Sequence, residues 1–185
     1  MSENLRISKK TIAFMLVGVL IAAFLGIVAG SYFFKVRSAE ALKSDPVLRL
    51  RIGQYFPEFR FTGLVSGQPD LYQSLAGRKS VVIFLTTDCE DCVQAVSRWD
   101  SMYPSISHEY QVFGVSYETI DRMNAYRAGK GIKFPLYNDP NGKFTAEHHV
   151  EHFPTIVGIN EKREIVFIGF STRSEESVGN YLKLL

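Results

Sequence analysis

Short apolar runs alternate with amphipathic segments along most of the chain, and this alternation predicts its strands and helices. The residues from Val81 to Leu85 are all apolar, which is typical of a strand buried on both faces. Downstream, Val93, Val96 and Trp99 recur at the spacing of one helix face. The pattern therefore predicts a central strand that leads directly into a helix over residues 92–102.

The same pattern predicts the remaining elements of a sheet. Strands are expected over residues 59–62, 111–116, 134–137, 155–159 and 164–168, and helices over residues 71–77, 119–128, 144–149 and 172–185. The helix after the cysteines should stop before Pro104, and the next helix should close at Gly129. A capping box from Thr172 to Glu175 should open the last helix. Strands that alternate with helices and end in a hairpin describe an α/β fold, in which helices flank a mixed sheet.

The N-terminal part has a different pattern. No charged residue interrupts the stretch from Ile12 to Phe34, which is long enough to span the roughly 30 Å hydrocarbon core of a bilayer. The apolar core of a signal peptide is usually about 7–15 residues long, so we interpret this stretch as one retained transmembrane helix. A signal peptide cleaved at the small residues of 38–41 is the alternative. The predicted order is a cytoplasmic tail (1–11), the anchor (12–34), a stalk (35–51) and one globular domain (52–185).

Composition and charge exclude one class of partner. The chain has 185 residues, with 21 basic and 19 acidic side chains, and no basic stripe is interleaved with aromatic residues. We therefore expect no nucleic acid partner. Positive charges flank the apolar stretch on both sides in similar number, so the positive-inside rule does not orient it.

Cys89 and Cys92 are the only cysteines, and they lie where the predicted central strand is followed by the predicted helix. Two intervening residues place the thiols about one helical turn apart, so the sulfurs can close a small disulfide ring. Unpaired backbone N–H groups at a helix N-terminus also favour a thiolate there. A static disulfide across so short a loop stabilises a fold little, so the pattern favours a redox-active dithiol.

Several segments in a fixed order resemble one family. They are Gly53 with Phe56-Pro57-Glu58-Phe59, Leu75-Ala76-Gly77-Arg78, Cys89-Glu90-Asp91-Cys92, Gly131-Ile132-Lys133-Phe134-Pro135, and Val150-Glu151-His152-Phe153-Pro154-Thr155. In these segments the chain resembles the membrane-anchored thioredoxin-like proteins of the TlpA/ResA type, which are extracytoplasmic thiol–disulfide oxidoreductases of bacteria. The resemblance covers roughly residues 52–170, and it implies a thioredoxin-like mixed sheet flanked by helices in the domain 52–185.

The resemblance also implies a role for each matching residue. Cys89 would be the exposed nucleophile and Cys92 the resolving thiol. Phe153 and Pro154 would form a cis peptide opposite the disulfide and, with Thr155, would contact the substrate chain. The enzyme would need no cofactor and would sit in the bacterial cell membrane with its catalytic domain outside. Its partners would be disulfide-containing proteins and a membrane electron donor, with cytochrome c or cupredoxin maturation as one use of the electrons.

The surroundings of the cysteines depart from the family pattern. Asp88 stands where an aromatic residue is usual, and the dipeptide Glu90-Asp91 lacks the common proline. Ile83 and Ala95 stand where the family often carries its two buried proton carriers. A side chain of the dipeptide, or water, would then have to move the proton.

Three acidic side chains next to Cys89 should tune its thiol. Asp88, Glu90 and Asp91 complement the positive end of the helix, but they also repel a thiolate and so raise the pKa of Cys89. We expect this pKa near or above the free value of about 8.5. A dithiol whose thiolate is not stabilised has a less stable reduced form and a low reduction potential, which favours a reductant.

A metal-binding function is one alternative for the same cysteines. Cys89 and Cys92, together with a histidine from the cluster His148, His149 and His152, could hold copper or zinc. A solvated or capping role near a helix end is the plainer interpretation of the histidine cluster, and we predict no metal.

A peroxidase is the other alternative. Thr86 stands three residues before Cys89, as in peroxiredoxins, but a second cysteine at two-residue spacing is unusual for that mechanism. Thr86 is therefore interpreted as a residue of the strand end. Arg122 and Arg127 are interpreted as part of a solvated helix face.

Overall fold

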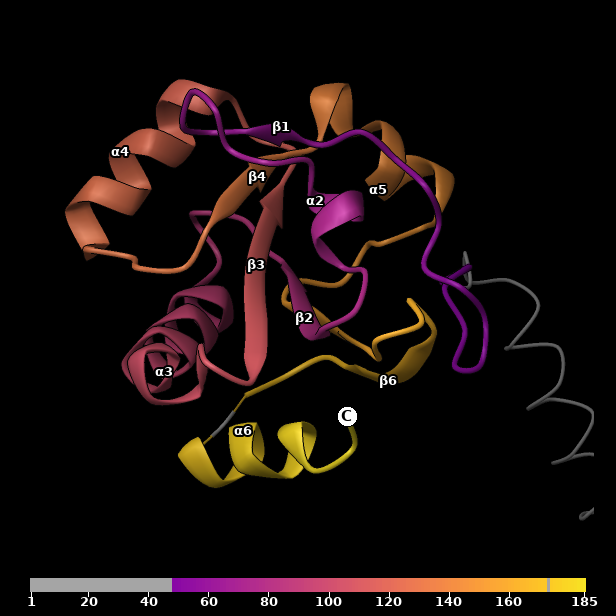
Figure 1. Cartoon of the computed structure of the whole chain (residues 1–185). Helices are drawn as coiled ribbons and strands as arrows, with labels where there is room; N and C mark the ends of the chain where they lie inside the picture. Colours follow the sequence, from indigo (N-terminus) through magenta and orange to yellow (C-terminus); the bar gives the residue numbers. More distant parts are fainter. Residues whose placement is uncertain (1–47, 173) are drawn as a thin grey trace, which may run out of the picture. The chain divides into compact units, whose positions relative to one another are not determined.

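One six-stranded mixed sheet organises the part of the chain that the computed structural model describes, residues 48–172 and 174–185 (Figure 1). The strands are β1 (Thr62–Gly63), β2 (Lys79–Phe84), β3 (Tyr110–Ser116), β4 (Leu136–Asn138), β5 (Thr155–Ile159) and β6 (Ile165–Gly169). They lie in the order β1-β4-β3-β2-β5-β6. The pairs β2–β3 and β3–β4 are parallel, and the pairs β1–β4, β2–β5 and β5–β6 are antiparallel. The sheet confirms the predicted mixed α/β class.

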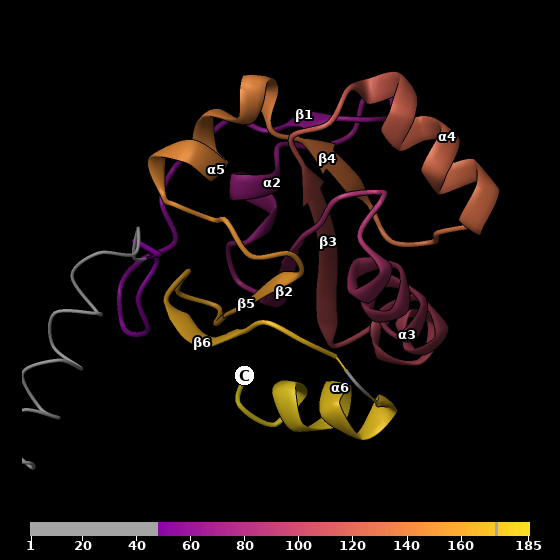
Figure 2. The ribbon, with the colours of Figure 1, turned by 180° about the vertical axis from the view of Figure 1, so that it is seen from behind.

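Helices cover both faces of this sheet. They are α2 (Leu71–Ser74), α3 (Glu90–Ile106), α4 (Ile120–Lys130), α5 (Lys143–Glu147) and α6 (Glu175–Leu182), with a 3-10 turn η1 (Pro140–Gly142) before α5. Buried residues of α3, α4 and α6 belong to one apolar cluster, and those of α2 and α5 belong to a second. Helices α3 and α6 lie side by side on their face (Figure 1 and Figure 2).

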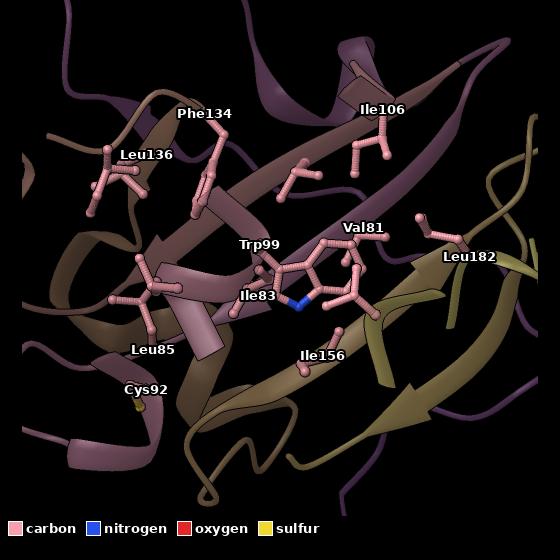
Figure 3. Packing of buried hydrophobic residues seen from close by; sticks show 14 of the residues in the cluster. Val81, Ile83, Leu85, Cys92, Trp99, Ile106, Phe134, Leu136, Ile156 and Leu182 are labelled. Carbon is pink, nitrogen blue, oxygen red and sulfur yellow. The ribbon is translucent and has the colours of Figure 1, made fainter. Parts of the chain in front are cut away.

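Strand β2 shows how the sequence produces the two apolar clusters. Successive side chains of a strand point to opposite faces, so a fully apolar strand feeds both. Val81 and Ile83 pack with the wholly buried Trp99 of α3 (Figure 3). Val82 and Phe84 pack on the other face, where the ring of Phe84 stacks on that of Phe144 at 5.5 Å.

Two helix boundaries differ from the sequence-based expectation. Helix α3 does not stop before Pro104 but continues to Ile106. Pro104 is exposed and cannot donate to the carbonyl of Asp100, but Ile106 is buried in the apolar cluster and holds the last turn. Helix α4 closes at Gly131, not at Gly129. Gly131 adopts the left-handed conformation (φ 64°) that ends many helices.

Two further elements begin elsewhere than predicted. The expected strand over 59–62 is reduced to β1, because Phe59 and Phe61 pack instead against the ring of Phe144 at 5.4 Å and 5.1 Å. The predicted capping box is wrong, since the N-cap of α6 is Ser174, whose hydroxyl accepts the N–H of Ser177. The helix ends at Leu182, short of the predicted residue 185.

The parallel arrangement brings three loops to one edge of the sheet. The carboxyl ends of β2, β3 and β4 point the same way, and ligand and catalytic sites of open α/β sheets lie at such an edge. The loop after β2 carries the cysteines, and the loop after β3 carries Glu118.

The described residues contain no helix that combines the length and the apolar character needed to cross a bilayer. The predicted anchor from Ile12 to Phe34 and the tail before it lie outside those residues.

Candidate active site

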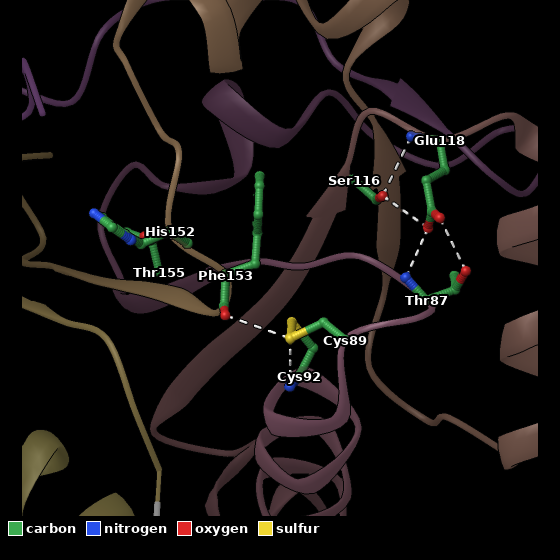
Figure 4. The surroundings of a disulfide bond; sticks show 8 residues. All are labelled: Thr87, Cys89, Cys92, Ser116, Glu118, His152, Phe153 and Thr155. Atoms are coloured by element: carbon green, nitrogen blue, oxygen red, sulfur yellow. Dashed lines mark hydrogen bonds between the residues drawn. A yellow bond between two sulfur atoms is a disulfide. The ribbon is translucent and has the colours of Figure 1, made fainter. Parts of the chain in front are cut away.

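A disulfide joins Cys89 and Cys92 at the start of α3 (Figure 4). Their Cα atoms are 5.1 Å apart, which is within the range that disulfides span. Cys89 is the N-cap of α3, and its Sγ accepts the backbone N–H of Cys92 at 3.1 Å. The first helical turn thus holds the sulfur next to a backbone donor, as the spacing of the cysteines predicted.

The two sulfur-bearing residues differ in their access to solvent. Cys92 is completely buried among the apolar residues beneath α3, whereas Cys89 is only partly buried. An incoming sulfur can therefore reach Cys89 but not Cys92. The exposed and the buried partner are the ones that the resemblance assigned to these positions.

The loop before β5 lies directly over the disulfide. The Cys89 Sγ is 3.4 Å from the carbonyl oxygen of Phe153, and the Phe153–Pro154 peptide bond is cis, as predicted. Pro154 and Thr155 are buried, and the Thr155 hydroxyl donates to the carbonyl of His152 at 2.6 Å. The backbone of Phe153 is therefore the part of this loop that faces the sulfur, while the side chain of Thr155 holds the loop together.

Glu118 is a residue of the site that the sequence did not reveal. Its carboxylate accepts the Thr87 N–H at 2.8 Å and the Thr87 hydroxyl at 2.9 Å, and the Ser116 hydroxyl lies at 3.3 Å (Figure 4). The Glu118 side chain is only 10% exposed. Asn138 of β4 donates to the Glu118 carbonyl at 2.5 Å. This network fixes the residue two positions before Cys89. The only sign of Glu118 in the sequence is its position just after the strand predicted over residues 111–116.

Arg122 is exposed, as predicted for a solvated helix face, but it also has partners that the sequence did not reveal. Its guanidinium pairs with the carboxylate of Asp88, and the two side chains are 48% and 81% exposed. Its Nε also lies 3.1 Å from Glu118 Oε1 and donates to the Thr87 hydroxyl at 2.8 Å. The carboxylates of Asp88 and Glu118 raise the pKa of Arg122, and the largest cause is the hydrogen bond that Arg122 donates to Asp88. The three acids near Cys89 are therefore not equivalent, since Asp88 has a cationic partner.

The other two acids and the positions of the missing proton carriers are as expected. Glu90 and Asp91 occupy the first turn of α3 and are exposed. Ile83 and Ala95 are fully buried in the apolar cluster. Their side chains cannot carry protons, so the buried surroundings of Cys92 offer none at these two places.

The three histidines do not converge on the cysteines. His148 packs on the ring of Phe144 at 4.4 Å, His149 lies 3.6 Å from a carboxylate oxygen of Glu151, and the His152 ring meets that of Phe170 at 6.0 Å. Figure 4 shows the imidazole of His152 pointing away from the disulfide. Within residues 48–172 and 174–185, no three His, Cys, Asp or Glu side chains gather as a possible metal site.

Aromatic side chains line the surface on both sides of the loop before β5, which carries Phe153. Tyr117, which is 46% exposed, packs against Phe153 with 5.7 Å between ring centroids. Phe170, which is 50% exposed, borders a groove of about 330 Å³. Residues of α3 and of the segment after β6 line this groove: Asp91, Gln94, Arg98, Phe170, Ser171 and Thr172.

Comparison with known proteins agrees with this architecture. A secreted disulfide oxidoreductase of Mycobacterium tuberculosis that is homologous to E. coli DsbE is similar, with 20% identity, a TM-score of 0.59, and coverage of 69% of this chain and 96% of that one. StoA from Bacillus subtilis has 20% identity and a TM-score of 0.59, over 70% of this chain and 99% of that one. Peroxidoxin BcpB from Mycobacterium tuberculosis has 15% identity and a TM-score of 0.63, over 73% and 96%. No curated protein matches the sequence at comparable significance.

These similarities confirm the thioredoxin-like fold that the sequence predicted. The model of the AhpC/TSA family matches residues 52–177, which is more than half of the chain and includes both cysteines. This match supports the prediction that the chain is an enzyme of thiol–disulfide chemistry. The chain belongs to the AhpC/TSA family.

Proposed function

We propose that this chain is a membrane-tethered thiol–disulfide oxidoreductase that reduces disulfides of extracytoplasmic proteins. The observation that supports the proposal is the different exposure of the two bonded cysteines. Cys89 is partly exposed beside the Phe153 carbonyl, whereas Cys92 is buried among the apolar residues beneath α3. An accessible sulfur can form a mixed disulfide with another protein, and a buried neighbour can resolve it. The family membership supports the same chemistry.

The catalytic cycle consists of two exchanges. The Cys89 thiolate attacks one sulfur of a substrate disulfide, and the other substrate sulfur leaves as a thiolate that takes a proton from water. Cys92 then gives its proton to water and attacks the Cys89 sulfur. The second substrate thiolate leaves, and the Cys89–Cys92 disulfide forms again. The substrate gains two electrons in this cycle, so a reductase in the membrane must return two electrons to the protein.

A reduction assay with the full chain in detergent tests this activity. With dithiothreitol as the electron source, the wild-type chain should accelerate the reduction of insulin. Cys89→Ser should abolish the acceleration, because no accessible nucleophile remains. Cys92→Ser should instead accumulate a mixed disulfide with insulin, which non-reducing electrophoresis detects. Equal rates for the wild-type chain and Cys89→Ser would contradict the proposal.

The location is tested separately. We infer a single-pass protein of the bacterial cell membrane, anchored by Ile12–Phe34, with residues 52–185 outside the cytoplasm. Protease added to spheroplasts should remove the domain while a cytoplasmic marker survives. Protection of the domain until the membrane is lysed would show the opposite orientation.

Peroxide reduction is a second candidate, favoured by the likeness to peroxidoxin BcpB and by Thr86 three residues before Cys89. In that reaction the Cys89 thiolate attacks peroxide, becomes a sulfenic acid and releases water or an alcohol. Peroxide consumption that survives Cys92→Ser but not Cys89→Ser would identify this activity. Consumption no faster than the uncatalysed rate would exclude it.

A further inference from the structure

We propose that Arg122 is a positioning residue of the redox site, which holds the carboxylate of Asp88 and offsets its negative charge beside the Cys89 thiolate. The inference rests on the proposed function only in so far as Cys89 reacts as a thiolate. It assigns a task to a helix residue that lies 33 positions from Cys89 in the sequence.

The geometry of Arg122 is that of a clamp on the loop before α3. The guanidinium binds Asp88 directly, and through Nε it also reaches Glu118 (3.1 Å) and the hydroxyl of Thr87 (2.8 Å). The single Nε–H donates to Thr87, a terminal nitrogen donates to Asp88, and Glu118 lies within ion-pair distance of Nε, so one planar group contacts all three side chains. The two residues immediately before Cys89 are thus bound to one side chain of α4.

Glu118 makes this clamp rigid. Its carboxylate accepts both the N–H and the hydroxyl of Thr87, and it is nearly buried, with 10% of the side chain exposed. The hydroxyl of Ser116 accepts the Glu118 N–H at 3.3 Å. Arg122 therefore meets a carboxylate that is already held in place, which lowers the entropic cost of ordering its own long side chain.

The charge balance around Cys89 gives the clamp a chemical consequence. The charged and titratable groups that the loop, α3, the β3–α4 segment and the cis-proline loop bring to the site are Asp88, Glu90, Asp91, Tyr117, Glu118, Arg122 and His152. Four of these are carboxylates and one is a guanidinium. The imidazole of His152 points away from the disulfide. Arg122 is thus the permanent positive charge in this set, and without it the repulsion on a Cys89 thiolate increases.

Titration of the Cys89 thiol tests the proposal. The full chain carrying Cys92→Ser has a single thiol, so thiolate absorbance or the pH dependence of alkylation reports Cys89 alone. In this background Arg122→Gln should raise the Cys89 pKa by about half a unit, which is about a threefold loss of thiolate at pH 7. Asp88→Asn should lower the pKa by a similar amount. The double variant should return near the starting value.

Lys130→Gln is the matched control. It removes the same charge from the same helix, but about 12 Å further along the axis at the opposite end of α4. It should leave the Cys89 pKa unchanged. If the pKa of Cys89 is the same in the Arg122→Gln variant and in the Lys130→Gln variant, the proposal is overturned.

The result of this titration does not depend on whether the proposed function is correct. If the wild-type chain fails to reduce insulin, the titration still measures the clamp. If the chain reduces insulin but the pKa does not respond to Arg122, the function stands and the clamp fails. With both intact, Arg122→Gln should slow the attack on a substrate disulfide at pH 7 by about twofold. The threefold loss of thiolate slows the attack, and the higher nucleophilicity of the more basic thiolate offsets part of that loss.

Discussion

Asp139 shows at the scale of one residue how the loops of the site are held. Its side chain is fully buried and accepts hydrogen bonds from the Phe144 N–H (3.0 Å), the Thr145 N–H (2.8 Å) and the Thr145 hydroxyl (2.6 Å). The preceding residue, Asn138, donates to the backbone of Glu118. One carboxylate therefore anchors α5 next to the segment that supports the redox loop.

Replacing this carboxylate should cost much of the stability of the fold. Asp139→Ala leaves the buried N–H of Phe144 and the partly buried N–H and hydroxyl of Thr145 without their acceptor. We expect a loss of about 2–4 kcal/mol in the free energy of unfolding. Asp70→Ala is the matched control, because Asp70 accepts one N–H, that of Gln73, at the more exposed start of α2. It should cost about 1 kcal/mol. Urea denaturation measures both, and equal losses would show that burial adds nothing at Asp139.

The residues of the site were predictable to the extent that their chemistry is local. Cys89, Cys92 and the Phe153–Pro154 bend follow from a motif and its resemblance to a family. Arg122 and Glu118 could not be predicted in this way. A polar residue on a helix has the same sequence pattern whether it faces water or a neighbouring loop. Only the fold, which places the start of α4 beside the loop after β2, shows which partner it meets.

At the scale of elements, the sequence located each strand and helix but not always its ends. The buried runs of β2, β3 and β5 are set by apolar side chains, so their predicted and observed ranges nearly coincide. Helix α3 passes Pro104 because tertiary contacts hold its last turn, with Ile106 in the apolar cluster. A single proline is therefore a weaker signal for the end of a helix than the burial of a neighbouring apolar side chain.

Helix α5 gives a prediction on pH. His148 ends this helix and packs on Phe144, and burial, the largest cause, lowers its pKa below the usual 6.5. The unfolded chain then binds a proton at a pH where the folded chain does not. The contribution of His148 to stability is therefore present above about pH 6.5 and decreases as the pH falls toward its lower folded pKa.

The measurement compares the free energy of unfolding at pH 7 and pH 5.5. His148→Gln should show a smaller drop between the two values than the wild-type chain. His108→Gln is the matched control at an exposed histidine, and it should retain the wild-type drop. If the free energy of unfolding of His148→Gln falls as much as that of the wild-type chain, other groups cause the pH dependence.

At the scale of the whole molecule, the sheet explains why distant residues meet at one site. The parallel strands β2, β3 and β4 end at the same edge, so the disulfide, Glu118 and Asn138 become neighbours although 49 positions separate Cys89 from Asn138. Alternation of strands and helices predicted such a sheet. The order of the strands within the sheet was not predicted, because apolar patterns do not specify which strands pair.

This arrangement leads to a prediction for the reduction potential of the full chain. Strong oxidants of this chemistry have a stabilised reduced form, in which a favourable site holds the thiolate. Here Asp88, Glu90 and Asp91 lie next to Cys89 in the sequence, and Arg122 pairs with Asp88. Glu90 and Asp91 have no cationic partner among the ion pairs of the described residues. The reduced form therefore gains little from its thiolate, and we expect a potential below about −200 mV.

Equilibration of the chain with a glutathione or dithiothreitol redox buffer measures this potential. Glu90→Gln with Asp91→Asn removes the two unpaired charges and should raise the potential toward that of oxidising relatives of this chemistry, because the thiolate is then less repelled. Lys130→Gln again serves as the distant control. A wild-type potential well above −200 mV would mean that the helix end outweighs the acids, and that the chain accepts electrons from its substrates instead of donating them.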